Sequence, residues 1–245
     1  KTQFRSDRHQ LRQAARAYVE IQKNYKSWQS SITFPENTND AELELVCLAF
    51  QAGMQYFESS FDFAIGLEEI LHEKHANNLP TICILIRQSF ECVLTTSWIF
   101  RSNIARELAR TGFQLAARDM RNLLNYTMTS NAYKKAGHSM TYLDQTDVME
   151  DRLKLLRLGS ELEFVGPNRR LKNYHPKITA LFRDAYIGGK HRNLSWIYVM
   201  LSSVGHGNSI RFLPSERELT KIIEIKDEFA SDALERMKSK MAKFI

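Results

Sequence analysis

Apolar residues recur mostly every three or four positions along this chain, which is the spacing of helices that bury one face. Near the start, for example, Leu11, Ala15, Tyr18 and Ile21 fall on a single helical stripe. No segment alternates apolar and polar residues over a length that would predict a convincing strand. The spacing predicts eight helices, over about 4–28, 41–75, 80–101, 103–135, 141–159, 176–186, 190–206 and 214–245.

Capping and breaking residues separate these segments. Asp40 is expected to cap the second helix, and Pro80 to stand in the first turn of the third. Gly159 is expected to close the fifth helix, whereas Gly53 or Gly66 is expected to bend the long second helix. Helices of this length, joined by short connections, pack as antiparallel neighbours.

The composition supports the same fold class. The 245 residues include only 10 glycines and 5 prolines, and 43% of residues are hydrophobic, enough for a sizeable core. We therefore expect an all-α multi-helix bundle of about eight helices, several of them long and antiparallel. The chain is expected to be a single helical domain over 1–245, with 1–38 as an N-terminal helical extension in the alternative arrangement.

Three features predict a cytoplasmic protein. Cys47, Cys83 and Cys92 are few, odd in number and set in apolar runs, which favours reduced, buried thiols. The charged first residues have no apolar core of a signal peptide. The segment 79–100 is long enough to span a bilayer, but the charged residues in its middle favour a buried helix and argue against a membrane partner.

The net charge of +6 at pH 7 makes acidic partners, above all nucleic acid, plausible. The basic residues are spread over the chain without an arginine-rich tract, so an ordinary solvated surface explains the charge equally well.

Two groups of polar residues, one of three and one of two, stand within apolar helical segments. Tyr198, Ser202 and His206 are four residues apart and share one face of the late helix 190–206. Arg87 and Glu91 are also four apart, in the middle of 80–101, where burying charges is costly unless they are paired. Each group predicts either a structural polar contact or part of a functional pocket.

The segments "RQSFE" and "WIYVMLSSVGHGN" resemble an uncharacterised family of helical bacterial proteins, which carry Arg-Ser-x-x-Glu on an early helix and Leu-Ser-x-x-x-His on a late one. Here Gln88 follows the arginine, where the family has serine. That family is in turn similar to the HEPN group, which includes metal-independent ribonucleases of toxin and phage-defence systems.

The resemblance implies an RNA-acting site, but the usual HEPN pair is incomplete. HEPN ribonucleases place a histidine about six residues after an arginine, whereas Thr127 follows Arg121 at that spacing and Arg192 has no histidine there either. Either the chain only binds RNA, or a different set of residues forms the site. The expected catalytic residues are Arg87, Glu91, Ser202 and His206, and the expected substrate-binding residues are Tyr198, Arg192 and Arg121.

In that scheme His206 exchanges a proton, Glu91 orients its ring and Arg87 holds the phosphate. A serine hydrolase is disfavoured because Ser202 lies one turn before the histidine and no Gly-x-Ser-x-Gly elbow is present. The pattern of Glu69, His72 and His75 does not match a metal motif, so no metal and no cofactor is expected.

The sequence thus predicts an RNA-binding protein or metal-independent endoribonuclease of bacterial defence or toxin type, with a polar pocket between 80–101 and 190–206. The alternative is a non-catalytic helical module that binds a partner protein or small ligand, with the same residues as a buried structural cluster. A homodimer is compatible with either.

Overall fold

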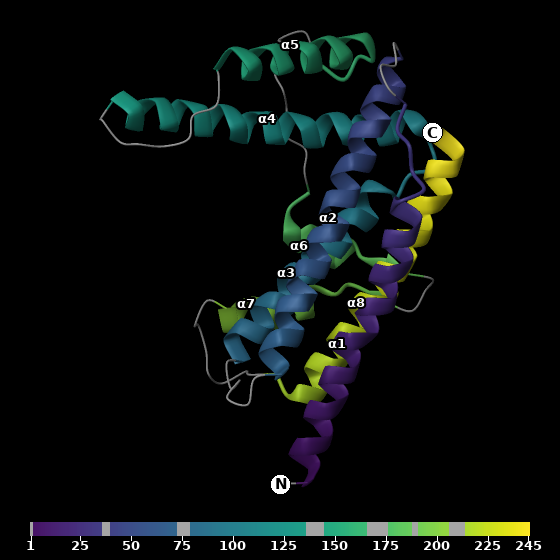
Figure 1. Ribbon diagram of the computed structural model, residues 1–245, viewed down its shortest axis with the longest axis vertical. Helices are drawn as coiled ribbons and strands as arrows, with labels where there is room; N and C mark the ends of the chain where they lie inside the picture. The colour runs from purple at the N-terminus through teal and green to yellow at the C-terminus, as the bar shows by residue number, and fades with distance from the viewer. Residues whose placement is uncertain are drawn as a thin grey trace. The chain divides into compact units, whose positions relative to one another are not determined.

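The computed structural model describes residues 2–35, 40–72, 79–135, 145–165, 176–187, 191–205 and 214–245. Within them the fold is all-α, as predicted (Figure 1). The helices are α1 (Thr2–Gln29), α2 (Ala41–His72), α3 (Leu79–Ile99), α4 (Ala105–Lys135), α5 (Gln145–Glu161), α6 (Ile178–Asp184), α7 (Ser195–Gly205) and α8 (Glu216–Phe244). Two strands of two residues each, β1 (Tyr186–Ile187) and β2 (His191–Arg192), pair antiparallel, where the sequence predicted only helix and turn.

The chain forms two compact units. The first comprises Lys1–Thr33, Gly53–Arg101 and Pro176–Lys243, and the second comprises Phe34–Ala52, Ser102–His175 and Phe244–Ile245. Compact units of one chain can still fold together, so the single domain expected from the sequence stays a prediction. The first helix, α1, lies within the first unit.

In the first unit, α1 and the second half of α2 pack through aromatic rings. The ring of Tyr18 lies 5.1 Å from that of Phe61, and the ring of Tyr25 lies 5.2 Å from that of Phe57, centroid to centroid. The hydroxyl groups of both tyrosines are satisfied, because Tyr18 pairs with Ser60 and Tyr25 donates to Glu58. The polar ends of these rings therefore add no unpaired group to the core.

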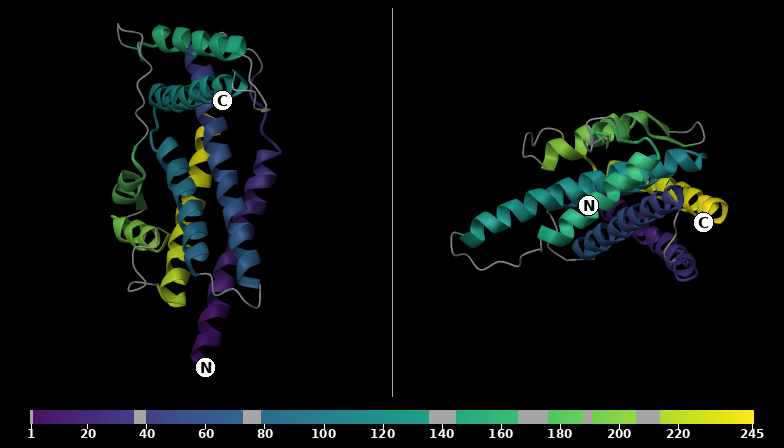
Figure 2. Two further views of the ribbon diagram at one scale, coloured as in Figure 1. Left: turned by 90° about the vertical axis from the view of Figure 1, so that its left-hand side faces the viewer. Right: turned by 90° about the horizontal axis from the view of Figure 1, so that it is seen from above.

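Helix α3 runs beside α2 in this unit (Figure 2). Gly53 of α2 permits a close approach of the chain just after α3, because a Cβ there would lie 2.4 Å from the ring of Phe100. The expected bend of α2 at Gly53 or Gly66 stays a prediction. Ser89 and Thr96 of α3 donate hydrogen bonds to the carbonyl groups of Ser60 and Gly53. Helix α3 is the one described helix long and apolar enough to cross a membrane, and 61% of that apolar window is buried in the fold.

The residues just before α7, Asn193 and Leu194, fix the start of this helix and tie it to α6. The amide of Leu194 donates to the carbonyl of Phe182 in α6. Asn193 adopts a positive φ of 52°, and its side-chain oxygen accepts a hydrogen bond from the amide of Ser195 at the start of α7. This cap fixes where α7 begins, five residues later than predicted. Helix α7 then packs mainly against α3, with α6 beside both (Figure 2).

The second unit packs α4 against α5 and the first residues of α2. Asp40 caps α2 as predicted, since its carboxylate accepts hydrogen bonds from the amides of Glu42 and Leu43. Gly159 lies inside α5 and does not end it, because the helix continues to Glu161. A Cβ at Gly159 would lie 2.4 Å from the ring of Phe113, so this glycine permits close packing.

Candidate functional site

Arg87 and Glu91 form the ion pair that their spacing predicts. The Nε of Arg87 donates a hydrogen bond of 2.6 Å to Oε1 of Glu91 one turn later in α3. The side chains are 18% and 12% exposed, so the pair is largely buried but reaches the surface. Among the described residues, only Nε of this guanidinium has a hydrogen-bond partner, which leaves its terminal nitrogen atoms as donors for a ligand.

Tyr198 of α7 packs against the arginine of this pair. The guanidinium carbon of Arg87 lies 4.9 Å from the centroid of the Tyr198 ring, within the range of a cation–π interaction. The same ring lies 5.4 Å from that of Phe182 in α6, and Phe182 lies 5.2 Å from Phe90 of α3. The aromatic chain places Tyr198 firmly and thereby fixes the arginine from a second side.

Ser202 lies one turn beyond Tyr198 on α7. It is 9% exposed, and its hydroxyl oxygen is buried without a hydrogen-bond partner among the described residues. A buried hydroxyl without a partner reduces stability. Within the described part of the chain, no hydrogen bond joins Ser202 to Arg87 or Glu91, so the expected four-residue cluster is seen only in part.

The remaining predicted residues lie elsewhere. His206 is outside the described residues, so its expected role as the proton-exchanging group stays a prediction. Arg192 lies in β2 opposite Tyr186, and its side chain is also outside the described part. Arg121 is exposed on α4, in the second unit, so it belongs to a different compact unit from Arg87.

The thiol nearest to this pair is no substitute nucleophile. Cys92 follows Glu91 directly, and burial, with the charge of that carboxylate, raises the pKa of the thiol to about 12. A thiol with this pKa is almost wholly protonated at neutral pH and therefore unreactive. All three cysteines are free, and only Cys92 is not fully buried.

The histidine pattern on α2 makes ordinary surface contacts. Nε2 of His72 lies 2.9 Å from Nη2 of Arg16 and 3.5 Å from a carboxylate oxygen of Glu68. Glu69 is exposed, and His75 lies outside the described residues. The part of the chain that the structure describes holds no group of three or more metal-ligating side chains.

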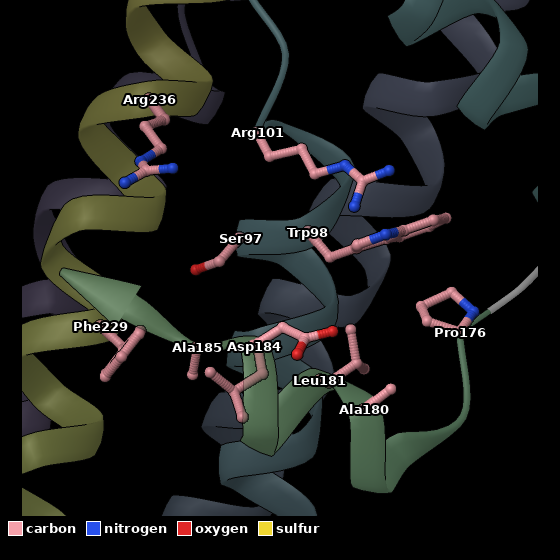
Figure 3. A pocket seen from close by; sticks show the side chains of 11 residues that line it. Ser97, Trp98, Arg101, Pro176, Ala180, Leu181, Asp184, Ala185, Phe229 and Arg236 are labelled. Carbon is pink, nitrogen blue, oxygen red and sulfur yellow. The ribbon is translucent and has the colours of Figure 1, made fainter. Parts of the chain in front are cut away.

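A second polar region, which no sequence motif indicates, lies at the end of α3. There Ser97, Trp98 and Arg101 line a cavity whose other walls include Asp184 of α6 and Arg236 of α8 (Figure 3). These residues are 52 to 139 positions apart along the chain, apart from the α3 group itself, and no local motif joins them. Only the packing of α6 and α8 beside α3 brings them together.

No protein-family model matches this sequence, and no curated protein or solved structure is significantly similar to it. The resemblance to a helical, HEPN-like family therefore stays a prediction. Any function has to be argued from the residues of this chain.

Proposed function

We propose that the protein binds RNA through Arg87, in a shallow site between α3 and α7. The observation that carries the proposal is the state of this guanidinium: Glu91 and Tyr198 fix it on two sides, while its terminal nitrogens have no partner among the described residues. A fixed guanidinium that still has free parallel donors suits the two oxygens of a phosphate. The positive net charge supports association with a polyanion.

Cleavage would be a further step at the same site. In metal-independent cleavage, the 2′-hydroxyl attacks the adjacent phosphorus, and the 5′-oxygen leaves with a proton, which gives a 2′,3′-cyclic phosphate. Arg87 would stabilise the charge on the phosphorane, and Glu91 is the nearest described carboxylate for accepting the proton of the 2′-hydroxyl. His206 is the residue proposed to protonate the leaving oxygen. Such an enzyme would fit a bacterial defence or toxin role.

The alternative function, a non-catalytic module, is favoured by one observation: Glu91 is only 12% exposed and already occupied by Arg87. In that case, the pair simply ties α3 to α7 through Tyr198. The two proposals differ in what the loss of Arg87 does, because a structural contact affects stability alone.

The test is fluorescence anisotropy with a labelled single-stranded RNA 12-mer, at several salt concentrations. Arg87→Gln is expected to weaken RNA binding about tenfold, which is the loss of one charged hydrogen bond, and to lower the salt dependence by about one counterion. The matched control is Arg217→Gln, which removes the same charge from an exposed position of α8 and should change binding less than about twofold.

Thermal unfolding of each variant completes the test. A folded wild type that binds no RNA at low salt, or an Arg87→Gln variant that loses stability but keeps full RNA affinity, supports the structural alternative and overturns RNA binding here. Cleavage is assayed separately with end-labelled RNA in EDTA, where a cyclic-phosphate product that His206→Ala abolishes is expected.

A further inference from the structure

A cavity in the first unit opens beside the last turn of α3, beyond the Arg87 region. Its volume is about 260 Å³, and its walls come from α3, α6 and α8 (Figure 3). This space corresponds to about nine water molecules at ~30 Å³ each, close to the lower end, ~300 Å³, of pockets that hold small organic molecules. A single small molecule fits this size, and an extended polymer does not.

One side of the pocket is cationic. Arg101, just after α3, and Arg236 of α8 both border the cavity, and Figure 3 shows their guanidinium groups on opposite sides of its upper part, Arg236 at the left and Arg101 at the right above Trp98. Arg236 is paired at 2.7 Å with Asp232, which fixes its position on α8. The guanidinium carbon of Arg101 lies 5.4 Å from the centroid of the Trp98 ring, which holds it above the indole. Two arginines at one edge favour an anionic group, above all a phosphate.

Below this edge, the pocket offers a flat apolar surface. The indole of Trp98 faces Leu181 and Ala180 of α6 across the cavity, with Pro176 at its open end (Figure 3). An aromatic face opposite apolar side chains suits a planar ring, because stacking and burial stabilise it without directional contacts. The cationic edge and the flat surface together call for a ligand with an anion joined to a ring.

Two polar groups add a third requirement. The carboxylate of Asp184 borders the same space, and the hydrogen bond from Arg183, together with the charges of Arg183 and Arg101, lowers its pKa. It is therefore ionised at neutral pH and accepts hydrogen bonds without donating them. The hydroxyl of Ser97 is buried without a partner, and Figure 3 shows its oxygen pointing into the space between Arg236 and Phe229. The carboxylate of Asp184 therefore favours a ligand with hydroxyl or amino donors, whereas the hydroxyl of Ser97 could donate or accept.

We infer that this pocket binds a nucleoside monophosphate. The phosphate meets Arg101 and Arg236, the base stacks on Trp98, and ribose hydroxyls or a base amino group donate to Asp184. The same chemistry is present in a free nucleotide and in the 5′-phosphorylated end of an RNA. The inference uses none of the residues of the Arg87 site, so the two proposals can fail separately.

Isothermal titration calorimetry with the four nucleoside 5′-monophosphates tests the inference on the full chain. We expect at least one monophosphate to bind, and its nucleoside and inorganic phosphate to bind at least tenfold more weakly. Arg101→Gln and Arg236→Gln are each expected to weaken binding about tenfold. The matched control is Lys238→Gln, which removes one charge from α8 two residues from Arg236 and is expected to change affinity less than twofold, because Lys238 pairs with Glu235 and does not line the cavity.

The source of the nucleotide is decided by adding 5′-phosphorylated and 5′-hydroxyl RNA 5-mers. Tighter binding of the phosphorylated 5-mer than of the 5′-hydroxyl 5-mer, with the difference lost in Arg101→Gln and Arg236→Gln but kept in Arg87→Gln, supports the inference with an RNA end as ligand. The inference is overturned if no monophosphate and no phosphorylated 5-mer binds, if inorganic phosphate binds as well as the nucleotides, or if Lys238→Gln weakens binding as much as Arg236→Gln. Thermal unfolding shows whether each variant is folded, and Trp98→Leu gives an independent variant that leaves both cations in place.

Discussion

Two polar regions on the same helix differ in how their charges are balanced. In the middle of α3, Arg87 finds its counter-charge in Glu91 one turn away, and the ring of Tyr198 lies against the guanidinium. At the end of α3, Arg101, just after the helix, and Arg236 of α8 face a cavity of about 260 Å³. The first region is nearly closed around its own ion pair, whereas the second leaves space beside its cations. Charged residues within an apolar helical segment, such as Arg87 and Glu91, therefore do not by themselves show where the larger cavity of the fold lies.

A third pair has a much more deeply buried cation. The side chain of Lys226 of α8 is 3% exposed and that of its partner Asp227, 3.1 Å away, is 16% exposed, and Nζ of Lys226 lies 3.4 Å from the centroid of the Tyr18 ring. It lines no described cavity and its neighbours are core residues, so we assign it a structural role. Arg87, at 18%, lies between this closed pair and the open pocket.

The largest effect is expected from the residue that supports both regions of α3. Phe90 is fully buried, and its ring contacts Phe182, which supports Tyr198, and Phe229, which lines the cavity. Phe90→Ala should lower the free energy of unfolding by about 3–5 kcal/mol, because it leaves a large void in the core. Urea denaturation measures this loss. A loss of unfolding free energy below about 1 kcal/mol would show that the ring of Phe90 does not support both regions.

A smaller effect is expected from breaking the partly exposed pair. Glu91→Gln keeps the shape of the side chain but removes the counter-charge of Arg87. The loss in unfolding free energy should be about 1–2 kcal/mol, less than the ~3–5 kcal/mol of a fully buried pair, because Arg87 still reaches solvent. Asp227→Asn, measured in the same urea titrations, should cost more than Glu91→Gln. The reverse order would mean that the Arg87 pair is the more closed of the two.

The features of the fold and of the site that could be predicted from the sequence are those formed by residues close together along the chain. The cap at Asp40 and the pairing of Arg87 with Glu91 follow from spacings of two to four residues, and both are present in the structure. The helix end predicted at Gly159 is wrong, and the close packing of a ring against Gly53 and Gly159 is not predictable from the sequence. The sequence shows a glycine but not the ring of Phe100 or Phe113 that packs against it.

The cavity could not be predicted for the same reason. Arg101 and Arg236 are 135 residues apart, and each alone looks like an ordinary surface cation. Their approach depends on how α8 packs beside α3, which helical periodicity does not specify. The Arg87 region was easier to find because both members of its ion pair lie on one helix.

The closed pair should also give a distinct pH dependence. Burial lowers the pKa of Lys226 below its ordinary value of 10.5, although the charge of Asp227 opposes this. Between the lowered pKa and 10.5, the unfolded chain binds more protons than the folded chain, so stability from this group rises with pH across that window. Unfolding free energies of the wild type and of Lys226→Met, measured from pH 7 to 10, should therefore diverge as pH rises, with the wild type gaining. Parallel curves would contradict the assignment.

The smallest effects are expected from two serines, one in each region, whose replacement distinguishes ligand binding at the cavity from RNA binding at Arg87. The hydroxyl oxygens of Ser97, at the cavity, and Ser202, on α7, are both buried without partners. Replacing either by alanine removes an unsatisfied group and improves helix propensity, so each variant should be more stable by about 0.5 kcal/mol. Ligand binding should respond differently in the two variants. Ser97→Ala should weaken nucleotide binding a few-fold and leave RNA affinity unchanged, whereas Ser202→Ala should weaken RNA binding and leave nucleotide affinity unchanged. A hydroxyl without a partner among the described residues affects only a ligand that it touches, so equal effects of both variants on both affinities would mean that the two regions form one site.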